Sequence, residues 1–331
     1  MWKYLNILLK KILIIRFSSI GDIVLTTPVI RCLKQQLKDS EIHFLTKEQF
    51  VPIVKANPYI DRIHFIKNDL KQILPQLKSE NFDFIVDLHK NFRSVFVKLK
   101  LRKPSKTFHK LNIKKWLLVN FKINLLPEIH IVDRYFEAVK ILNVKNDGKG
   151  LDYFIPENEK VNISELPSTH QNGFIGFAIG GKHNTKMFPV EKIISVCEKI
   201  NKPVILLGGY EDIKTGEYIK KTVGDKIYNA CGKYSINQSA SLVWQAEKII
   251  SNDTGLMHIA AAFKKHIVSI WGNTVPAFGM YPYLPETEKN KSVIVEIKNL
   301  HCRPCSKLGY KKCPKGHFGC MQKINEEKII A

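Results

Sequence analysis

The chain of 331 residues lacks three features whose absence excludes whole classes of protein. No apolar run approaches the ~18–20 residues that a membrane-spanning helix needs. Neither a phosphate-binding loop of the Walker type nor a Gly-x-Gly-x-x-Gly fingerprint occurs, so the two most familiar nucleotide motifs are missing. No Asp-x-Asp pair occurs either, and a divalent metal held by two carboxylates at that spacing is therefore not indicated.

Acidic residues are scarce, and one long stretch has none. The chain holds 52 Lys and Arg residues against 30 Asp and Glu residues, which gives a formal net charge of +22. Between Leu88 and Pro127 there is no Asp or Glu, while basic and aromatic residues are interleaved. A lysine-rich composition explains part of this excess but not its clustering. The charge predicts a polyanionic partner, and the lack of a nucleic-acid-binding module argues against nucleic acid.

A helix expected within this acid-free stretch has two interpretations. Its apolar residues share one face that is flanked by lysines: they are Ile113, Trp116, Leu117 and Phe121, with Lys114, Lys115 and Lys122 beside them. This pattern suits a helix that lies on an anionic membrane surface. It is equally typical of a helix that packs on the protein through its apolar face and keeps its basic face in solvent.

The N-terminal segment has the pattern of a strand, a tight loop and a helix. Ile12–Ile15 is a continuous apolar run, as expected for a strand buried on both faces. Ser18, Ser19 and Gly21 then permit a turn, and from Asp22 onward the apolar spacing is helical. Because ligands of open α/β sheets bind at the carboxyl ends of strands, this loop is a candidate site. Asp22 is either a helix N-cap or a group that takes part in chemistry.

Strands and helices alternate twice along the chain. Short apolar strands are expected at 12–15, 42–45, 63–66 and 84–88, and again at 174–179, 204–207, 227–229, 249–251 and 267–271. Their alternation with helices is typical of doubly wound parallel sheets. Polar stretches at 145–150 and 156–171 suggest a linker. We therefore expect an α/β protein with two Rossmann-like domains, residues 1–160 and 161–331, that face each other across a cleft.

Three loops of the second half follow expected strands and suit an anionic ligand. Gly180–Lys186 carries two lysines, which can neutralise phosphate charge. Gly208–Asp212 ends in carboxylates, which can accept hydrogen bonds from ribose hydroxyls or cap the next helix. Asn252–Gly255 leads into an Ala-rich helix, whose free N–H groups and dipole favour a phosphate. Each loop also has a simpler interpretation, as a solvated loop or a helix cap.

Four segments, taken in this order, resemble the bacterial ADP-heptose:lipopolysaccharide heptosyltransferases of glycosyltransferase family 9. They are Arg16–Asp22, Lys186–Pro189, Gly208–Asp212 and Ser251–His258. The resemblance implies the GT-B fold, in which one Rossmann-like domain binds the acceptor and the other the nucleotide-sugar. It also implies an inverting transfer of heptose from ADP-heptose to an anionic lipopolysaccharide inner-core acceptor, with Asp22 as general base.

The same resemblance implies roles for further residues. Those of the donor side are Lys186 on the diphosphate, Thr254 and Gly255 on phosphate, Asp253 near the sugar and Asp212, or else Glu211, on the ribose. Those of the acceptor side are Ser18, Ser19, Gly21, Lys90 and Arg93. In this chain Lys90, Asn91 and Phe92 stand where the family pattern has small or apolar residues. No cofactor is expected to be required, since lysine and backbone N–H groups would meet the charge of the leaving group.

Four of the seven cysteines lie within the last thirty residues, at Cys302, Cys305, Cys313 and Cys320. Their spacing resembles a four-thiolate zinc site with a structural role, although the second pair is not Cys-x2-Cys. A packed set of reduced thiols is the alternative, and disulfides fit a cytosolic protein least. The remaining thiols are expected to be buried, at Cys32, Cys197 and Cys231.

Residues Met1–Lys11 run into the first strand without a small-residue cleavage site, so we expect a short extension, not a signal peptide. This predicts a cytoplasmic protein, peripherally associated with the inner face of the cytoplasmic membrane. Two other functions stay open. A transferase for a different surface polysaccharide, or an epimerase, could use another nucleotide-sugar on the same scaffold. The charge alone would permit a non-enzymatic polyanion-binding protein.

Overall fold

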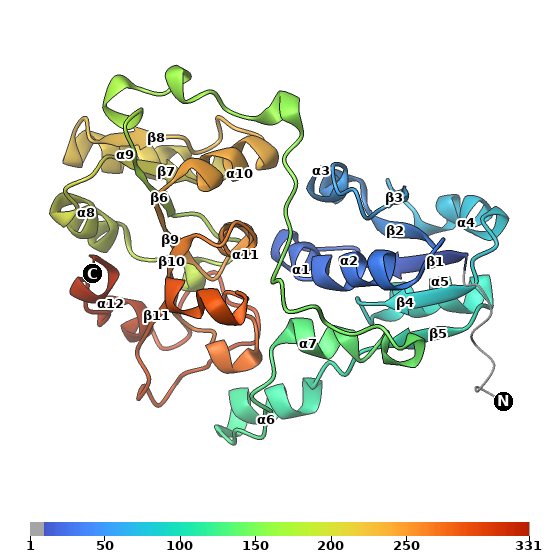
Figure 1. Ribbon diagram of the computed structural model, residues 1–331. Helices are drawn as coiled ribbons and strands as arrows, with labels where there is room; N and C mark the ends of the chain where they lie inside the picture. Colours follow the sequence, from blue (N-terminus) through green and yellow to red (C-terminus); the bar gives the residue numbers. More distant parts are fainter. Residues whose placement is uncertain (1–9, 331) are drawn as a thin grey trace. The chain divides into compact units, whose positions relative to one another are not determined.

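The computed structural model describes residues 10–330, which divide by their contacts into two compact units. Unit 1 holds residues 10–110 and 129–154, and unit 2 holds 111–128 and 155–330 (Figure 1). The expected domain limits, 1–160 and 161–331, differ from this division in the segments 111–128 and 155–160, both of which belong to unit 2. Apart from Lys10 and Lys11, the expected N-terminal extension lies outside the described residues.

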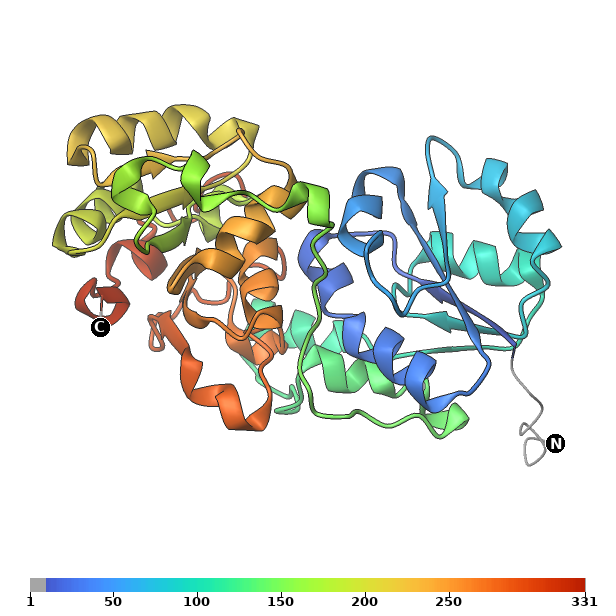
Figure 2. The same ribbon diagram turned by 45° about the horizontal axis from the view of Figure 1, so that its top comes forward.

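Unit 1 is built on a parallel sheet of five strands in the order β3-β2-β1-β4-β5. Its strands are β1 (Lys11–Ile15), β2 (Glu41–Lys47), β3 (Arg62–Ile66), β4 (Phe84–Asp87) and β5 (Ser105–Thr107). Its α-helices are α1 (Ile20–Val24), α2 (Thr27–Gln36), α3 (Val51–Val54), α4 (Leu70–Ser79), α5 (Phe92–Leu101) and α7 (Ile131–Phe136). Helices cover both faces of the sheet (Figures 1 and 2).

Unit 2 repeats this plan with six parallel strands in the order β11-β10-β9-β6-β7-β8. Its strands are β6 (Ile175–Ala178), β7 (Val204–Leu207), β8 (Ile227–Asn229), β9 (Lys248–Asn252), β10 (His266–Trp271) and β11 (Ser292–Glu296). Its α-helices are α6 (Asn112–Phe121), α8 (Val190–Lys199), α9 (Ile213–Val223), α10 (Ile236–Gln245), α11 (Gly255–Ala262), α12 (Gly319–Gln322) and α13 (Glu327–Ile330).

The apolar runs of the sequence form the central strands because each is covered on both faces. Four residues of β1, Ile12–Ile15, are fully buried. The residues of β7 are also buried, with at most 1% of a residue exposed. All nine strands expected from the sequence are present. Two strands were not expected, β5 and β11. Both are edge strands, β5 is the polar tripeptide Ser-Lys-Thr, and β11 exposes Val293 and Ile294.

Each sheet reverses its strand order at one point. In unit 1 the chain proceeds from β1 outward to β3 and then returns to place β4 on the other side of β1. In unit 2 it proceeds from β6 outward to β8 and returns to place β9 beside β6. The loops that leave such neighbouring strands at their carboxyl ends diverge, which opens a ligand-binding crevice there. The two candidate regions are therefore the β1/β4 edge and the β6/β9 edge.

The basic, aromatic helix α6 belongs to unit 2 because its lysines contact that unit. The Nζ of Lys122 donates to the carbonyl oxygens of Val119, at 2.6 Å, and Pro304, at 2.7 Å. The ammonium of Lys115 lies 5.4 Å from the centre of the Phe278 ring. Lys122 is thus engaged with its own unit, whereas Ile113, Trp116 and Phe121 are exposed. Among the described residues, no helix is both long and apolar enough to cross a membrane.

Two histidines form a buried hydrogen-bonded pair between β2 and β3. Nδ1 of His43 lies 2.9 Å from Nε2 of His64, and Nε2 of His43 lies 3.2 Å from a carboxylate oxygen of Glu41. Burial and the neighbouring His43 lower the pKa of His64 to about 4, and burial lowers that of His43. Neutral imidazoles fit this chain of bonds: Nε2 of His64 can donate to Nδ1 of His43, and Nε2 of His43 to Glu41, while Nδ1 of His64 is buried without a hydrogen-bond partner.

Acid should destabilise the fold through this pair. Above pH 6.5 His64 is mostly neutral in both states, whereas below it only the unfolded chain protonates His64 until the pH approaches 4. The lowered pKa of His43 acts in the same direction. The free energy of unfolding, measured by urea titration, should therefore fall between pH 7 and pH 5. The His64→Leu variant should show a shallower fall, and the exposed control His266→Leu should keep the wild-type slope. A slope unchanged in His64→Leu would contradict this account.

Candidate active site

Asp22 lies at the β1/β4 edge and is held by three donors. Its Oδ1 is 2.6 Å from Nη2 of Arg16, while its Oδ2 accepts hydrogen bonds from the Oγ of Ser19 at 2.7 Å and from the Ser19 N–H at 3.1 Å. Ser19 is the N-cap of α1, so the carboxylate belongs to a capping box. The Asp22 side chain keeps 23% of its surface exposed. Asp22 is therefore not the N-cap, as one interpretation of the sequence had it, but the third residue of α1, whose carboxylate accepts the N–H of the N-cap. The exposed part leaves the carboxylate available for chemistry.

Arg16 is the residue that orients Asp22, and it is itself buried. Its Nε donates to the carbonyl of Ser18 at 2.9 Å, and its Nη1 donates to the carbonyl of Leu88 and to the hydroxyl of Tyr135 at 3.0 Å. Only 6% of Arg16 is exposed. The sequence showed Arg16 as part of a motif but gave it no role. The partner hydroxyl comes from α7, far along the chain, and no local pattern indicates it.

The loop after β4 is organised by Asp87, which is completely buried. Its carboxylate accepts hydrogen bonds from the N–H groups of His89 and Lys90 and from the hydroxyl of Ser94 at 2.8 Å, and it pairs with Nζ of Lys98 at 2.9 Å. The two acceptor residues expected here therefore differ in their positions. Lys90 donates to the carbonyl of Phe108 at 3.1 Å, within the loop, whereas Arg93 is exposed on α5.

Two basic residues of this edge were not expected from the sequence. The Nδ1 atom of His89 is buried without a hydrogen-bond partner, and burial together with Arg16 and Lys110 lowers the pKa of His89 to about 4. Nζ of Lys110 donates to the carbonyl of Lys90 at 3.0 Å, and burial lowers the pKa of Lys110. Both residues interact electrostatically with Asp22. This edge of unit 1 thus combines the carboxylates of Asp22 and Asp87, both held by donors, with further basic groups that can meet an anionic ligand.

In unit 2, the β6/β9 edge brings Lys186 and Asp253 together. Nζ of Lys186 lies 2.5 Å from Oδ2 of Asp253, which also accepts a hydrogen bond from Thr274 at 2.9 Å. Thr254 and Gly255 follow directly, as the N-cap and first residue of α11. The first N–H groups of a helix have no partner within it, so the start of α11 can bind an anion. All four donor residues expected at this edge are therefore close together.

Asp212 occupies a different position from the other donor residues. It is 3% exposed, its Oδ2 accepts a hydrogen bond from the Gly209 N–H at 2.8 Å, and burial raises its pKa. A Cβ at Gly180 would lie 2.1 Å from this oxygen and one at Gly208 would lie 2.7 Å from it, so both glycines are needed for close approach. Asp212 thus organises two loops, while its neighbour Glu211 is exposed.

The C-terminal tail supports the Lys186 region, which the sequence did not indicate. Thr185 and Tyr310 exchange hydrogen bonds, with the Tyr310 N–H donating to the Thr185 hydroxyl at 2.8 Å. Arg303, 9% exposed, donates to the carbonyls of Gly272 and Thr274 and pairs with Glu296 at 2.7 Å. The tail therefore fixes the residue before Lys186 and the loop whose Thr274 contacts Asp253.

The seven cysteines are all free thiols, and Cys32, Cys197 and Cys231 are buried as expected. Burial and the neighbouring tail thiols raise the pKa of Cys305 and that of Cys320. Within residues 10–330, the group of three potential metal ligands whose atoms all lie within 4.8 Å of one another is His43, His64 and Glu80, and the tail cysteines form no such group. As arranged, they do not fit a tetrahedral zinc site, in which neighbouring sulfur atoms lie about 4 Å apart. Structural zinc stays a prediction for metal analysis to test.

The His43, His64 and Glu80 group is held mainly by contacts within the protein, although Nδ1 of His64 has no hydrogen-bond partner. The histidines bond to each other, and the Glu80 carboxylate pairs with Arg62 at 2.5 Å and with Lys11 at 3.3 Å. Two cations already neutralise the carboxylate that a metal ion would need. The contacts of this group are therefore those of a structural network.

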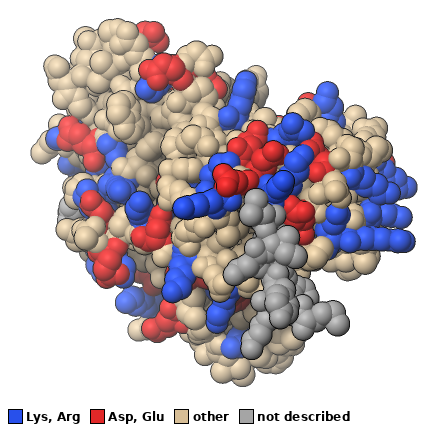
Figure 3. Space-filling model, turned by 45° about the vertical axis from the view of Figure 1, so that its right-hand side comes forward, with Lys and Arg blue, Asp and Glu red and all other residues tan. Residues whose placement is uncertain are grey.

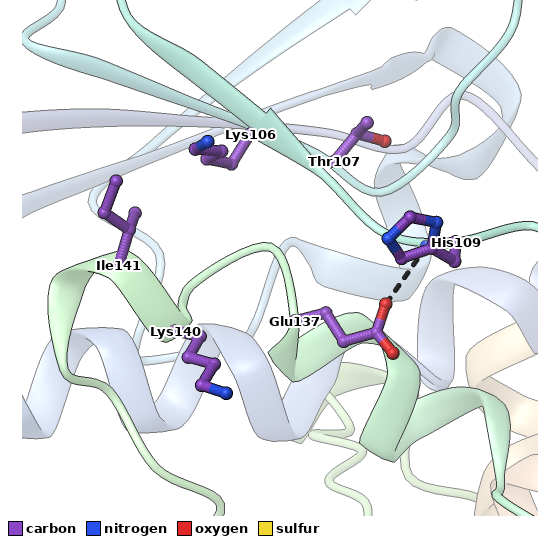
Figure 4. Close-up of a pocket in the computed structure, with 6 residues that line it drawn as sticks. All are labelled: Lys106, Thr107, His109, Glu137, Lys140 and Ile141. Carbon is purple, nitrogen blue, oxygen red and sulfur yellow. Dashed lines mark hydrogen bonds between the residues drawn. The ribbon is translucent and has the colours of Figure 1, made fainter.

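A hollow of about 600 Å³ in unit 1 contains none of the expected site residues. Figure 4 shows its lining: Lys106, Thr107, His109, Glu137, Lys140 and Ile141. The backbone N–H of His109 donates to the Glu137 carboxylate at 3.2 Å. The hollow lies beside the edge strand β5 and not at the β1/β4 edge, so it is not assigned to the candidate active site.

Known proteins resemble the chain over most of its length. The model of glycosyltransferase family 9 (heptosyltransferase) matches residues 71–311. A lipopolysaccharide heptosyltransferase 1 from Campylobacter coli is 28% identical over 97% of both chains. The structure of E. coli ADP-heptose lps heptosyltransferase II superposes with a TM-score of 0.74 at 19% identity, over 97% of this chain and 96% of that one. The structure of E. coli heptosyltransferase WaaC with ADP superposes with a TM-score of 0.63 at 18% identity, over 86% of this chain and 92% of that one. These likenesses confirm the expected fold class of two Rossmann-like domains.

Removal of Arg16 should destabilise unit 1 strongly. The Arg16→Met variant leaves the Asp22 carboxylate and the Leu88 carbonyl without their buried donor, so we expect a loss of roughly 3 kcal/mol in the free energy of unfolding. Urea titration measures this loss. The control Lys202→Met removes an exposed ion pair with Glu247 and should cost less than about 1 kcal/mol. Equal stability of the two variants would show that the Arg16 contacts contribute nothing special.

Proposed function

The chain belongs to glycosyltransferase family 9 and is therefore a transferase. We propose that it moves a heptose from ADP-heptose to an anionic lipopolysaccharide inner-core acceptor. The names of its relatives support heptose as the sugar and lipopolysaccharide as the acceptor. The observation that carries the proposal is the oriented, partly exposed carboxylate of Asp22 at the β1/β4 edge. It is the group best suited to accept a proton from a bound hydroxyl.

In the proposed reaction, Asp22 is the general base of an inverting transfer. One carboxylate oxygen takes the proton of the acceptor hydroxyl while that hydroxyl oxygen forms a bond to the anomeric carbon. The bond from this carbon to the diphosphate breaks on the opposite face, and ADP leaves with the electron pair. The guanidinium of Arg16, 2.6 Å away, favours the ionised carboxylate and holds it in place. General-base help of this kind contributes about 10²–10⁴ in rate.

The donor would bind at the β6/β9 edge of unit 2. There the diphosphate would replace Asp253 as the partner of the Lys186 ammonium, and it would accept hydrogen bonds from the N–H groups at the start of α11, from Thr254 and Gly255 onward. Asp253 would then face the sugar. Because Asp212 is buried in its loop, the exposed Glu211 is the better placed of the two for the ribose hydroxyls. Lysine and backbone N–H groups would meet the charge of ADP without a cofactor.

The acceptor would bind beside Asp22 through its charged groups. Lys110 and Arg93 would contact carboxylate or phosphate oxygens, Ser18 and Ser19 would contact hydroxyls, and Gly21 and Lys90 would shape the loop. Lys110 joins the residues expected from the sequence because it interacts electrostatically with Asp22. A lipid-anchored acceptor also fits the proposed peripheral association with the inner face of the cytoplasmic membrane.

Replacement of the proposed base should lower turnover strongly and leave the affinity for the donor almost unchanged. The Asp22→Asn variant should lower kcat by about 10²–10⁴, because the amide cannot take the proton. Binding of ADP-heptose, measured by calorimetry, should change by less than about twofold. The exposed control Asp225→Asn should keep wild-type kcat. Near-normal turnover in Asp22→Asn would remove Asp22 from its role.

The identity of the donor can be tested without an acceptor. In a thermal-shift screen of nucleotide-sugars, ADP-heptose should raise the melting temperature, because a ligand that binds only the folded state stabilises it. The Lys186→Ala variant should weaken this binding by about 10–100-fold, the value of one charge-assisted contact. The exposed control Lys182→Ala should bind as the wild type does. A response to UDP-sugars instead would favour a different transferase or an epimerase.

A further inference from the structure

Helix α5 presents an apolar stripe to solvent. Phe92 is 96% exposed, Leu99 is 68% exposed and Val95, between them, is 42% exposed. Their spacing of three and four residues places them on one side of the helix. The opposite side packs into unit 1 through the buried Ser94, Val97 and Leu101. The stripe is therefore not part of the core of unit 1. It is a surface on which two large apolar side chains, Phe92 and Leu99, are exposed to water.

The surroundings of the stripe are basic. Helices α4 and α5 pack against each other, and neither contains an Asp or Glu residue. The cations that these two helices and the residues after α5 carry are Lys71, Lys78, Arg93, Lys98, Lys100, Arg102 and Lys103. Lys98 pairs with Asp87 and Lys103 donates to the side chain of Asn81, while neither helix supplies a carboxylate to pair with the other cations. Figure 3 shows lysine and arginine side chains gathered at the right-hand edge of that view, with little acidic surface among them.

The stripe begins at the edge of the sheet that carries Asp22. Strand β4 pairs with β1, with Ile15 opposite Asp87, and the loop from β4 leads through His89 and Lys90 directly to Phe92. Phe92 is the first residue of α5, so the most exposed apolar side chain lies at the carboxyl edge of the sheet, near the candidate active site of the same unit. A surface that covers Phe92 would bring its own headgroups toward that edge.

We infer that α5 is the element through which unit 1 docks on an anionic lipid bilayer. Phe92, Val95 and Leu99 enter the boundary between headgroups and acyl chains, while the lysines and arginines of α4 and α5 contact acidic headgroups. A soluble polyanion would use the cations but gives no reason for the apolar stripe. A second copy of the chain would place two basic faces together, which like charges oppose. The inference rests on the proposed function only for why a bilayer should lie near Asp22.

Vesicle sedimentation of the full chain tests this inference without any substrate. The wild type should partition onto vesicles that contain phosphatidylglycerol and much less onto pure phosphatidylcholine. The double variant Phe92→Ser, Leu99→Ser should lower the partition constant at least about tenfold, because two apolar side chains no longer leave water. The matched control Tyr218→Ser, Trp244→Ser removes two exposed aromatic residues of unit 2 and should bind as the wild type does.

Two further variants separate charge from apolar contact and α5 from α6. The first is the triple variant Lys71→Gln, Lys78→Gln, Lys100→Gln, which should lose most of the preference for vesicles that contain phosphatidylglycerol. Trp116→Ser, Phe121→Ser, on α6, should keep wild-type partition. An unchanged melting temperature and an unchanged response to ADP-heptose verify that each variant is folded.

Three outcomes would overturn the inference. They are full vesicle binding by the α5 double variant, loss of binding only in the α6 variant, and a wild-type dimer in solution that the α5 variant alone abolishes. Failure of the proposed function has a different signature. In that case vesicle binding would still require α5, while no heptose would be transferred to any lipopolysaccharide acceptor.

Discussion

The ion pair between Arg16 and Asp22 is the interaction on which the candidate active site depends. A guanidinium that is almost wholly buried supplies donors to the β1 loop, to the β4 end and to α7 at once. Its remaining donors hold Asp22 at 2.6 Å. Because burial of this charge is tolerable only with all partners present, the loop has little freedom to place Asp22 elsewhere. The geometry of the candidate site and the stability of unit 1 thus depend on the same residue.

In unit 2 a charged side chain of the candidate site is likewise held in place by an ion pair. Lys186 is paired with Asp253 at 2.5 Å, and Asp253 is held in turn by Thr274. The tail reinforces both sides, since Tyr310 bonds to Thr185 and Arg303 bonds to the Thr274 carbonyl. A lysine prepared by a carboxylate can exchange that partner for a diphosphate with little rearrangement. This arrangement gives the cysteine-rich tail a structural role that does not depend on a metal.

The sequence predicted what depends on local pattern and missed what depends on distant partners. Apolar runs indicated nine of the eleven strands, and small residues after them indicated the loops of Asp22, Lys186 and Thr254. Strand β5 has no apolar pattern, because an edge strand of three polar residues needs none. Lys110, Tyr135 and Arg303 acquire their roles through contacts that cross many residues of chain. For Asp212 the sequence offered two interpretations, a ribose contact or a helix cap, and the structure shows the capping contact with the Gly209 N–H.

The segment 111–128 gives the chain an unusual connectivity. The backbone passes between the two units three times, after residue 110, before residue 129 and after residue 154. Neither unit is therefore one continuous piece of polypeptide. A fragment that ends at residue 154 would keep α6 but lose the Pro304 carbonyl to which Lys122 donates and the Phe278 ring beside Lys115. Dissection of this enzyme into independently folding halves therefore requires excision of α6, and not merely a cut between the two sheets.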